Sequence, residues 1–126
     1  MKPEVADAIE EIKSGWRGST VVVSEDGSGG AFVIVEGVSP GEQYAQAETW
    51  IGFQITFNYP YSDVYPHFVR GDLSRKDGAV LGEAMSSTSF EGRPAIQISR
   101  KSKNLNAVTD TAAIKLAKVL TWLRSR

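Results

Sequence analysis

Cysteine is missing from the 126 residues altogether, and this absence removes several kinds of chemistry at once. Without a thiol the chain forms no disulfide, holds no metal through thiolates and offers no cysteine nucleophile. Long apolar runs are missing too, since no stretch approaches the ~20 residues that span a bilayer. The polar segment from Met1 to Asp7 also lacks the apolar run of a signal peptide. We therefore expect a cytoplasmic protein without membrane association.

Charge of one sign does not dominate, because the net charge at pH 7 is only -1. That balance conceals an uneven distribution: residues 1–63 carry ten acidic and three basic side chains, whereas residues 64–126 carry five acidic and eleven basic ones. Either the two halves attract each other within the fold, or the second half forms a basic face for an acidic protein or a phosphate backbone. A pI near 5.8 makes nucleic acid the weaker choice. The cations of such a face are Arg100, Lys101, Lys103, Lys115, Lys118, Arg124 and Arg126.

Regular patterns are clearest in the first half of the chain, whose composition is ordinary for a globular protein. A helix is predicted from Pro3 to Gly15, because proline suits a first helical turn and apolar side chains recur at helical spacing. Two β-branched runs, at 19–24 and 31–35, flank a glycine-rich turn and predict an antiparallel hairpin. Residues 51–57 alternate apolar and polar side chains and predict a third strand.

The second half of the chain is less regular. Residues from Asn58 to about Pro94 are predicted to be mainly loop. A long loop in a compact domain is usually functional. A fourth short strand is predicted from Ala95 to Ser99, followed by a C-terminal helix that Thr109 or Asp110 caps. We therefore predict a single α+β domain over residues 1–126, with a four-stranded antiparallel meander sheet and helices packed on one face.

Two Tyr-Pro pairs, at 59–60 and 65–66, follow the third predicted strand. Together with the order of the elements, they resemble the ubiquitin-conjugating-enzyme-like (UBC-like, or E2-like) superfamily, which also includes the RWD domains and cysteine-less E2 variants. The segment Gly92–Arg100 and the helix end Leu120–Leu123 are similar to bacterial E2-like proteins of ubiquitin-like conjugation operons. The resemblance implies a UBC-like fold, a bacterial origin and a role in antiviral defence. It gives a structural role to Tyr59, Pro60 and Pro66.

The chemistry of this superfamily depends on a cysteine that the chain lacks. Catalytic E2 enzymes carry it after a His-Pro-Asn segment, and the corresponding stretch, Asp72–Arg93, has neither feature. The resemblance therefore implies a non-catalytic module that binds a ubiquitin-like protein or an E1-like or E2-like protein. An alternative stays open: an E2-type conjugating enzyme whose catalytic cysteine has been substituted. The positions that would have held that cysteine are Ala84, Ser86 and Ser87.

Several aromatic and basic residues are candidates for contacts with a partner. Trp50 occupies an even-numbered position, whereas the apolar side chains of the third predicted strand occupy odd-numbered ones. Its side chain therefore stands on the outer sheet face or packs beneath the following loop. His67, the only histidine, is interpreted either as a contact residue or as a loop histidine bonded to backbone. The candidate set is Trp50, Tyr61, Tyr65, His67, Arg100, Lys101 and Lys103.

A stand-alone hydrolase is a weaker hypothesis. Any Ser-His-Asp triad would need His67, and no Gly-x-Ser-x-Gly elbow accompanies the serines. The remaining members of a triad would come from Ser62, the serines between 86 and 89, Asp63 and Asp72. One histidine without cysteine also leaves no spaced set of metal ligands, so the sequence indicates neither a metal nor a cofactor.

Overall fold

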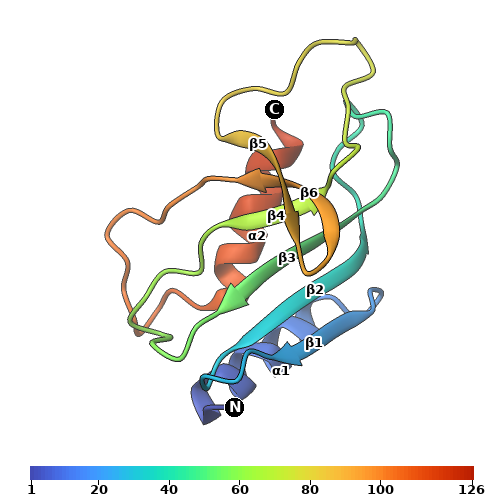
Figure 1. Ribbon diagram of the computed structural model, residues 1–126. Helices are drawn as coiled ribbons and strands as arrows, with labels where there is room; N and C mark the ends of the chain where they lie inside the picture. The colour runs from blue at the N-terminus through green and yellow to red at the C-terminus, as the bar shows by residue number, and fades with distance from the viewer.

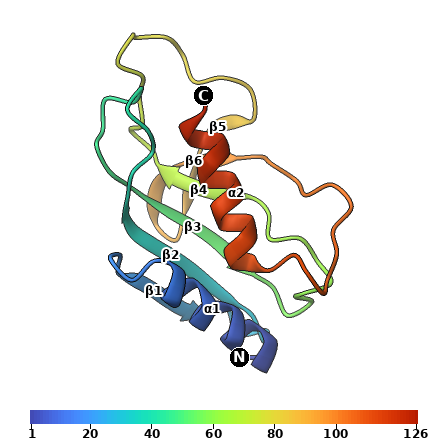
Figure 2. The same ribbon diagram turned by 180° about the vertical axis from the view of Figure 1, so that it is seen from behind.

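Residues 1–126 are described by the structure, which is a computed structural model. The bounds of its elements are α1 Pro3–Gly15, β1 Val21–Glu25, β2 Ala31–Val38, β3 Thr49–Ile55, β4 His67–Arg70, β5 Met85–Phe90, β6 Arg93–Ile98 and α2 Ala112–Arg124. The strands form one antiparallel sheet in the order β1-β2-β3-β4-β6-β5, and both helices cover the same face of it (Figures 1 and 2). This arrangement confirms the predicted α+β class. Neither helix has the length and apolar character that a membrane crossing needs.

α1 forms where the sequence predicts it, beginning at Pro3 and ending at Gly15. Proline fits the first turn because its missing N–H would have no partner inside the helix at that position. Apolar residues recur every three or four positions, so one stripe of the helix packs on the sheet. That stripe consists of Val5, Ala8, Ile9 and Ile12.

The predicted hairpin of β1 and β2 is confirmed, and Asp26 holds its turn. The Asp26 carboxylate accepts hydrogen bonds from the backbone amides of Ser28 and Gly30, at 2.8 and 3.0 Å. Gly30 has no room for a side chain, because a Cβ there would lie 2.3 Å from the carbonyl oxygen of Ile55 on β3. The backbone of the turn therefore packs directly against β3.

The main core lies between the sheet and the two helices. Successive residues of a strand face opposite sides of a sheet, so alternate side chains of β2, β3, β4 and β6 point into this core. The hydroxyl of Tyr44, in the β2–β3 connection, donates a hydrogen bond to the carbonyl oxygen of Leu123 at 3.2 Å. This carbonyl lies in the last turn of α2, where it has no partner within the helix. The helix side of the core is formed by the α1 stripe with Ala112, Ala113, Leu116, Val119, Leu120 and Leu123 of α2.

Six strands rather than four make up the sheet, so the prediction of four strands is wrong. The two strands that the sequence does not predict, β4 and β5, lie within the segment from Asn58 to Pro94, most of which is otherwise loop, as predicted. β4 is four residues long and reads His-Phe-Val-Arg, so its residue types do not alternate between apolar and polar although its burial does. β5 reads Met-Ser-Ser-Thr-Ser-Phe and lies at the sheet edge, where its four central side chains are exposed. A polar edge strand of this kind carries no apolar signal in the sequence.

β5 and β6 form a hairpin whose tip folds over the outer face of the sheet, the face without helices (Figure 1). Its turn residues, Glu91 and Gly92, have φ of 49° and 75°, as in a tight two-residue hairpin turn. Phe90 at the tip stacks on Phe68 of β4, with ring centroids 4.5 Å apart. Gly52 on β3 leaves the space for this ring, because a Cβ there would lie 2.6 Å from Phe90 Cε2.

A hydrogen bond joins the Tyr-Pro segment to the start of α2. Tyr59 is buried, and its hydroxyl accepts a hydrogen bond from the backbone amide of Ala112 at 3.1 Å. The prolines of both Tyr-Pro pairs follow cis peptide bonds. α2 is capped by Thr111, so the prediction of Thr109 or Asp110 as its cap is wrong. Asp110 instead accepts a hydrogen bond from an amide of the preceding loop, which holds it away from the capping position.

Candidate functional site

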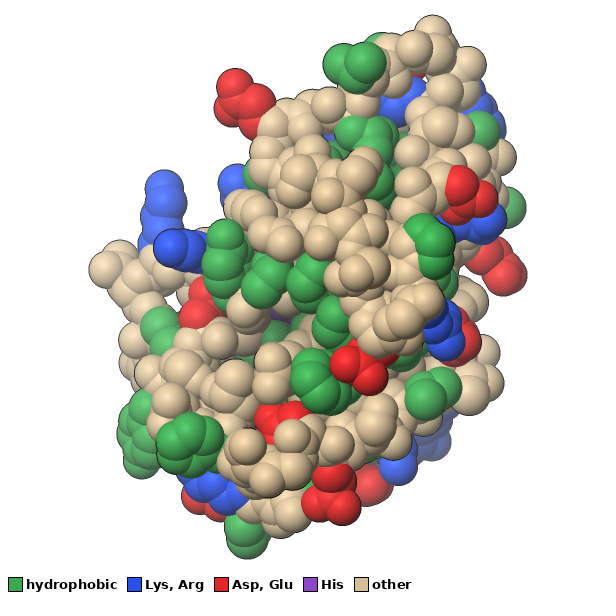
Figure 3. Space-filling view, viewed as in Figure 1, with side chains coloured by type: hydrophobic (Ala, Val, Ile, Leu, Met, Phe, Trp, Pro, Cys, Tyr) green, Lys and Arg blue, Asp and Glu red, His purple; other side chains and the backbone are tan.

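A groove of about 790 Å³ opens on the outer side of the sheet, beside the tip of the β5–β6 hairpin. Residues of β2 and β3, the end of β4 and the hairpin turn form its walls. Figure 3 shows this face of the molecule, where a band of hydrophobic side chains crosses the middle and charged side chains lie around it. The side chains that shape the groove are Glu36, Glu48, Trp50, Arg70, Asp72 and Arg93.

Trp50 is the only aromatic residue in the groove, and it stands on the outer sheet face, as its parity predicts. Its indole is half-buried and stacks with Phe90, with ring centroids 6.2 Å apart. The Arg93 guanidinium lies over the indole, 5.2 Å from the ring centroid. Both terminal nitrogens of Arg93 donate to the Glu36 carboxylate, at 3.0 and 3.2 Å. This bidentate pair fixes the guanidinium plane and thereby the position of Trp50.

A second ion pair lines the groove where β4 ends. Arg70 donates to the Asp72 carboxylate through two nitrogens, and its third nitrogen donates to the carbonyl oxygen of Glu48 at 2.9 Å. The hydrogen bonds from Arg70 lower the pKa of the Asp72 carboxyl, and the same bonds raise the pKa of the Arg70 guanidinium. Both groups are therefore charged at neutral pH, and the arginine is held in one place.

The groove combines one tryptophan with two ion pairs. It contains no histidine, lysine or cysteine, and both of its arginines are already paired with carboxylates. No group of three or more histidine, aspartate or glutamate side chains lies together as a metal site would require. A tryptophan among fixed arginines is a typical composition of protein interfaces, where both residue types are enriched.

His67 is buried, which contradicts the prediction that it contacts a partner. It belongs to β4, is 0% exposed and packs on Phe53, with ring centroids 5.1 Å apart. Neither ring nitrogen has a hydrogen-bond partner, so the alternative of a loop histidine bonded to backbone is wrong as well. Burial lowers its pKa from 6.5 to about 3. The side chain is therefore neutral at pH 7 and enclosed on the core side of the sheet.

The candidate members of a catalytic triad do not come together. The Ser62 hydroxyl shares a hydrogen bond with a threonine hydroxyl, and the Asp63 carboxylate binds Lys115. The serines of β5 lie on an exposed edge strand, whereas His67 lies in the core. The hydrolase hypothesis therefore has no support from the geometry.

The positions that would have held a substituted cysteine lie at the start of the β5 edge. Ala84 directly precedes the strand and has a φ of 67°. Ser86 and Ser87 are both exposed. Neither serine lies in the groove at Trp50. A former cysteine at one of these three positions stays a prediction.

The other candidate contact residues lie in two places outside the groove. Tyr61 is 79% exposed and lines a shallow hollow beside the Tyr-Pro segment. Tyr65 lies beneath Lys101, whose ammonium is 5.3 Å from the ring centroid. A separate pocket beside α2 is lined by Arg100, Lys101 and Lys103. The structure therefore divides the predicted set among three surfaces and the core.

The sequence by itself does not indicate which residues hold Trp50 in place. Parity places Trp50 correctly because alternation along a strand is a local property. The Glu36–Arg93 pair joins residues 57 positions apart, which no local pattern shows. The one available signal was Gly92, since a glycine after Glu91 is compatible with a two-residue hairpin turn.

Comparisons with protein-family models, with curated proteins and with solved structures find no match to this chain.

Proposed function

We propose that the chain is a non-catalytic, E2-like interaction module that binds a ubiquitin-like protein or an E1-like or E2-like partner of a conjugation pathway. The observation that carries the proposal is the groove at Trp50, where an indole is held by Arg93 and Glu36 on the outer sheet face. A cytoplasmic, bacterial role in antiviral defence belongs to the same proposal, on the resemblance alone.

The absence of a thiolate nucleophile supports the proposal of a non-catalytic module. E2 enzymes carry their cargo as a thioester, which needs a thiolate nucleophile. The chain has no cysteine, and its single histidine is enclosed in the core with no hydrogen-bond partner. Binding to pathway proteins is the part of E2 biology that such a chain retains.

The construction of the groove supports a protein partner. Hot spots at interfaces are enriched in tryptophan and arginine, and they work best where little rotamer freedom is lost on binding. Trp50 and Arg93 are already ordered by each other, by Phe90 and by Glu36. Glu48, the one carboxylate of the groove without an ion pair, would favour a basic or amide-bearing group on the partner.

An NMR titration of the isotope-labelled chain tests the proposal, with ubiquitin-like, E1-like and E2-like proteins encoded beside its gene as titrants. We expect resonances of the groove to shift with one of them, and Trp50→Ala to weaken binding by about tenfold or more, as a truncated hot spot does. Val80→Ala is the control, because Val80 is an exposed apolar residue outside both the groove and the hollow at Tyr61.

A third variant separates the groove from the Tyr-Pro loop. Tyr61→Ala removes the most exposed tyrosine and leaves the groove intact. Loss of binding in this variant, with full binding by Trp50→Ala, would place the contact on the loop and contradict the role of the groove. Absence of shifts with every titrant would contradict the interaction module itself.

A further inference from the structure

A second pocket, of about 360 Å³, lies between α2 and the segment that leads from β6 to it. Five cationic side chains line it, three from the segment and two from the helix, and Asp110 is the only acidic residue among them. It shares no residue with the groove at Trp50. The cationic lining consists of Arg100, Lys101, Lys103, Lys115 and Lys118.

Most of the positive charge in this pocket is not neutralised by the protein. Arg100, Lys101 and Lys103 form no ion pair, and Lys118 approaches Asp110 only to 3.9 Å. Attraction between the acidic and basic halves of the chain does not account for these cations. Only the Glu36–Arg93 and Asp63–Lys115 ion pairs join the two halves.

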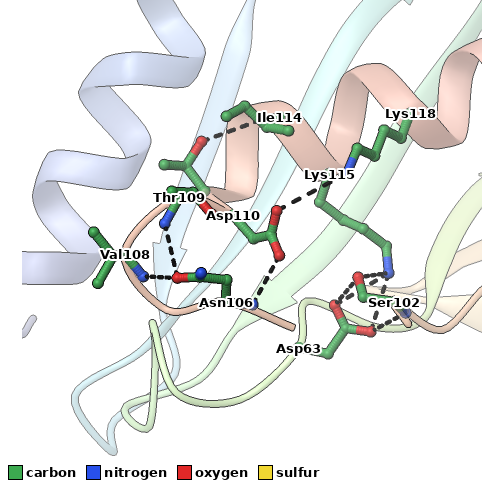
Figure 4. A network of polar contacts seen from close by, with 10 residues as sticks. Asp63, Ser102, Asn106, Val108, Thr109, Asp110, Ile114, Lys115 and Lys118 are labelled. Carbon is green, nitrogen blue, oxygen red and sulfur yellow. Dashed lines mark hydrogen bonds and ion pairs between the residues drawn. The ribbon is translucent and has the colours of Figure 1, made fainter. Parts of the chain in front are cut away.

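The fifth cation, Lys115, is nearly buried and fixes the floor of the pocket, so its predicted place on an exposed basic face is wrong. Its ammonium donates to both carboxylate oxygens of Asp63, at 3.1 and 3.0 Å, and to the Ser102 hydroxyl at 2.8 Å (Figure 4). The backbone amide of Ser102 also donates to Asp63, at 2.7 Å. These hydrogen bonds connect the segment between β6 and α2, the helix α2 itself and the Tyr-Pro loop.

Two aromatic rings position two of the unpaired cations. The Arg100 guanidinium lies over Trp122, 5.1 Å from the ring centroid, and Lys101 lies over Tyr65 at 5.3 Å. A ring face attracts a cation without neutralising its charge. Arg100 and Lys101 are therefore held at the pocket while their charge stays available to an anion.

We propose that this pocket binds the phosphate group of a small phosphorylated molecule. A phosphate carries about 1.5 to 2 negative charges and three acceptor oxygens, so it can accept hydrogen bonds from several cations at once. The volume is that of a small-ligand pocket rather than of an extended channel for a polymer. The chain has a net charge of -1, so this gathering of cations is not the by-product of a basic protein. The inference goes beyond the proposed function, because it concerns another surface.

Pyrophosphate is the probe that tests the proposal, titrated into the isotope-labelled full chain at low ionic strength. We expect NMR shifts at Ser102, at Lys103 and at the indole N–H of Trp122. The double variant Lys101→Gln/Lys103→Gln removes two exposed ammonium groups and should weaken binding by about tenfold or more. Lys76→Gln is the matched control, since Lys76 is exposed and lies outside the pocket, and it should leave the affinity unchanged.

Further titrants identify the source of the phosphate and set the outcomes that overturn the proposal. Tighter binding of ATP than of pyrophosphate would assign a nucleotide, and equal binding would assign the phosphate alone. No shift at pyrophosphate concentrations on the order of 10 mM would overturn the proposal. So would an equal loss of affinity in Lys76→Gln, or tighter binding of an acidic peptide or of single-stranded DNA. Trp50→Ala should bind pyrophosphate normally, which keeps this test separate from that of the groove.

Discussion

Two ionisable residues of the second half of the chain, His67 and Lys115, are buried. Lys115 keeps its partners inside the fold, because Asp63 and Ser102 accept all the hydrogen bonds of its ammonium. His67 has no partner at either nitrogen and is enclosed by the core. A buried cation is tolerated when it is paired, and an unpaired group stays neutral instead.

The neutral state of His67 makes the stability of the protein depend on pH. Its pKa in the folded protein is about 3, against an ordinary 6.5, because of burial first and the nearby Lys115 second, while Asp63 opposes the shift. As the pH falls below 6.5, the unfolded chain takes up a proton at this histidine and the folded chain does not. The contribution of His67 to the free energy of unfolding should therefore fall by about 1.4 kcal/mol for each pH unit, from about pH 6 toward pH 4.

Urea unfolding at a series of pH values measures this dependence, and His67→Leu provides the comparison. The variant lacks the titrating group, so its unfolding free energy should change less steeply over the same pH range, whatever its absolute stability. Equal slopes in the two proteins would contradict the proposed neutral, buried histidine. Comparison of slopes also removes the contribution of carboxylates, which both proteins share.

The β5–β6 hairpin is the element that turns the outer sheet face from a flat surface into a groove. Its tip places Phe90 on the sheet and brings Arg93 over Trp50. Gly52 permits this, since any side chain there would occupy the site of the Phe90 ring. The hairpin therefore depends on one missing Cβ in a strand that it does not pair with.

Gly52→Ala tests how far the hairpin depends on this contact. Alanine normally suits a strand better than glycine, yet here its Cβ should displace Phe90 and lower the free energy of unfolding by about 1–3 kcal/mol, as overpacking does. Urea unfolding gives the free energy, and NMR shifts of Trp50 report the displaced ring. Gly18→Ala is the control, because nothing lies within 4 Å of a Cβ at that position. Equal stability of Gly52→Ala and the native protein would contradict the packing argument.

The whole molecule presents two proposed binding surfaces of different chemistry. The groove at Trp50 combines an indole with paired charges, whereas the pocket beside α2 has unpaired cations. No lining residue is common to the two. The chain therefore combines a surface suited to a protein with one suited to a small anion.

Separate surfaces should be independent in binding. We expect saturation with pyrophosphate to change the affinity for a protein partner by less than about twofold, because residues without shared contacts contribute almost additively. The same independence should hold in reverse for Lys101→Gln/Lys103→Gln, which should bind the protein partner normally. Calorimetric titration of the partner with and without pyrophosphate measures the coupling. A tenfold change would show that the two surfaces act as one.

Local patterns in the sequence determined the α+β class, α1, the β1–β2 hairpin and the side of the sheet on which Trp50 stands. Each of these depends on periodicity or turn residues within a few positions. The missing cysteine likewise excluded thiolate chemistry by composition alone. The start of α2 was misplaced, because Thr109, Asp110 and Thr111 are all chemically able to cap a helix.

Only the tertiary structure decided the features on which the two proposed binding surfaces depend. β4 and β5 carry too little local signal, so their pairing with β6 makes them strands. The burial of His67, the Glu36–Arg93 pair and the hydrogen bonds around Lys115 all join residues far apart in the chain. A sequence shows which side chains exist and how a short segment orders them. Which of them end buried, paired or free depends on contacts that form only when the chain has folded.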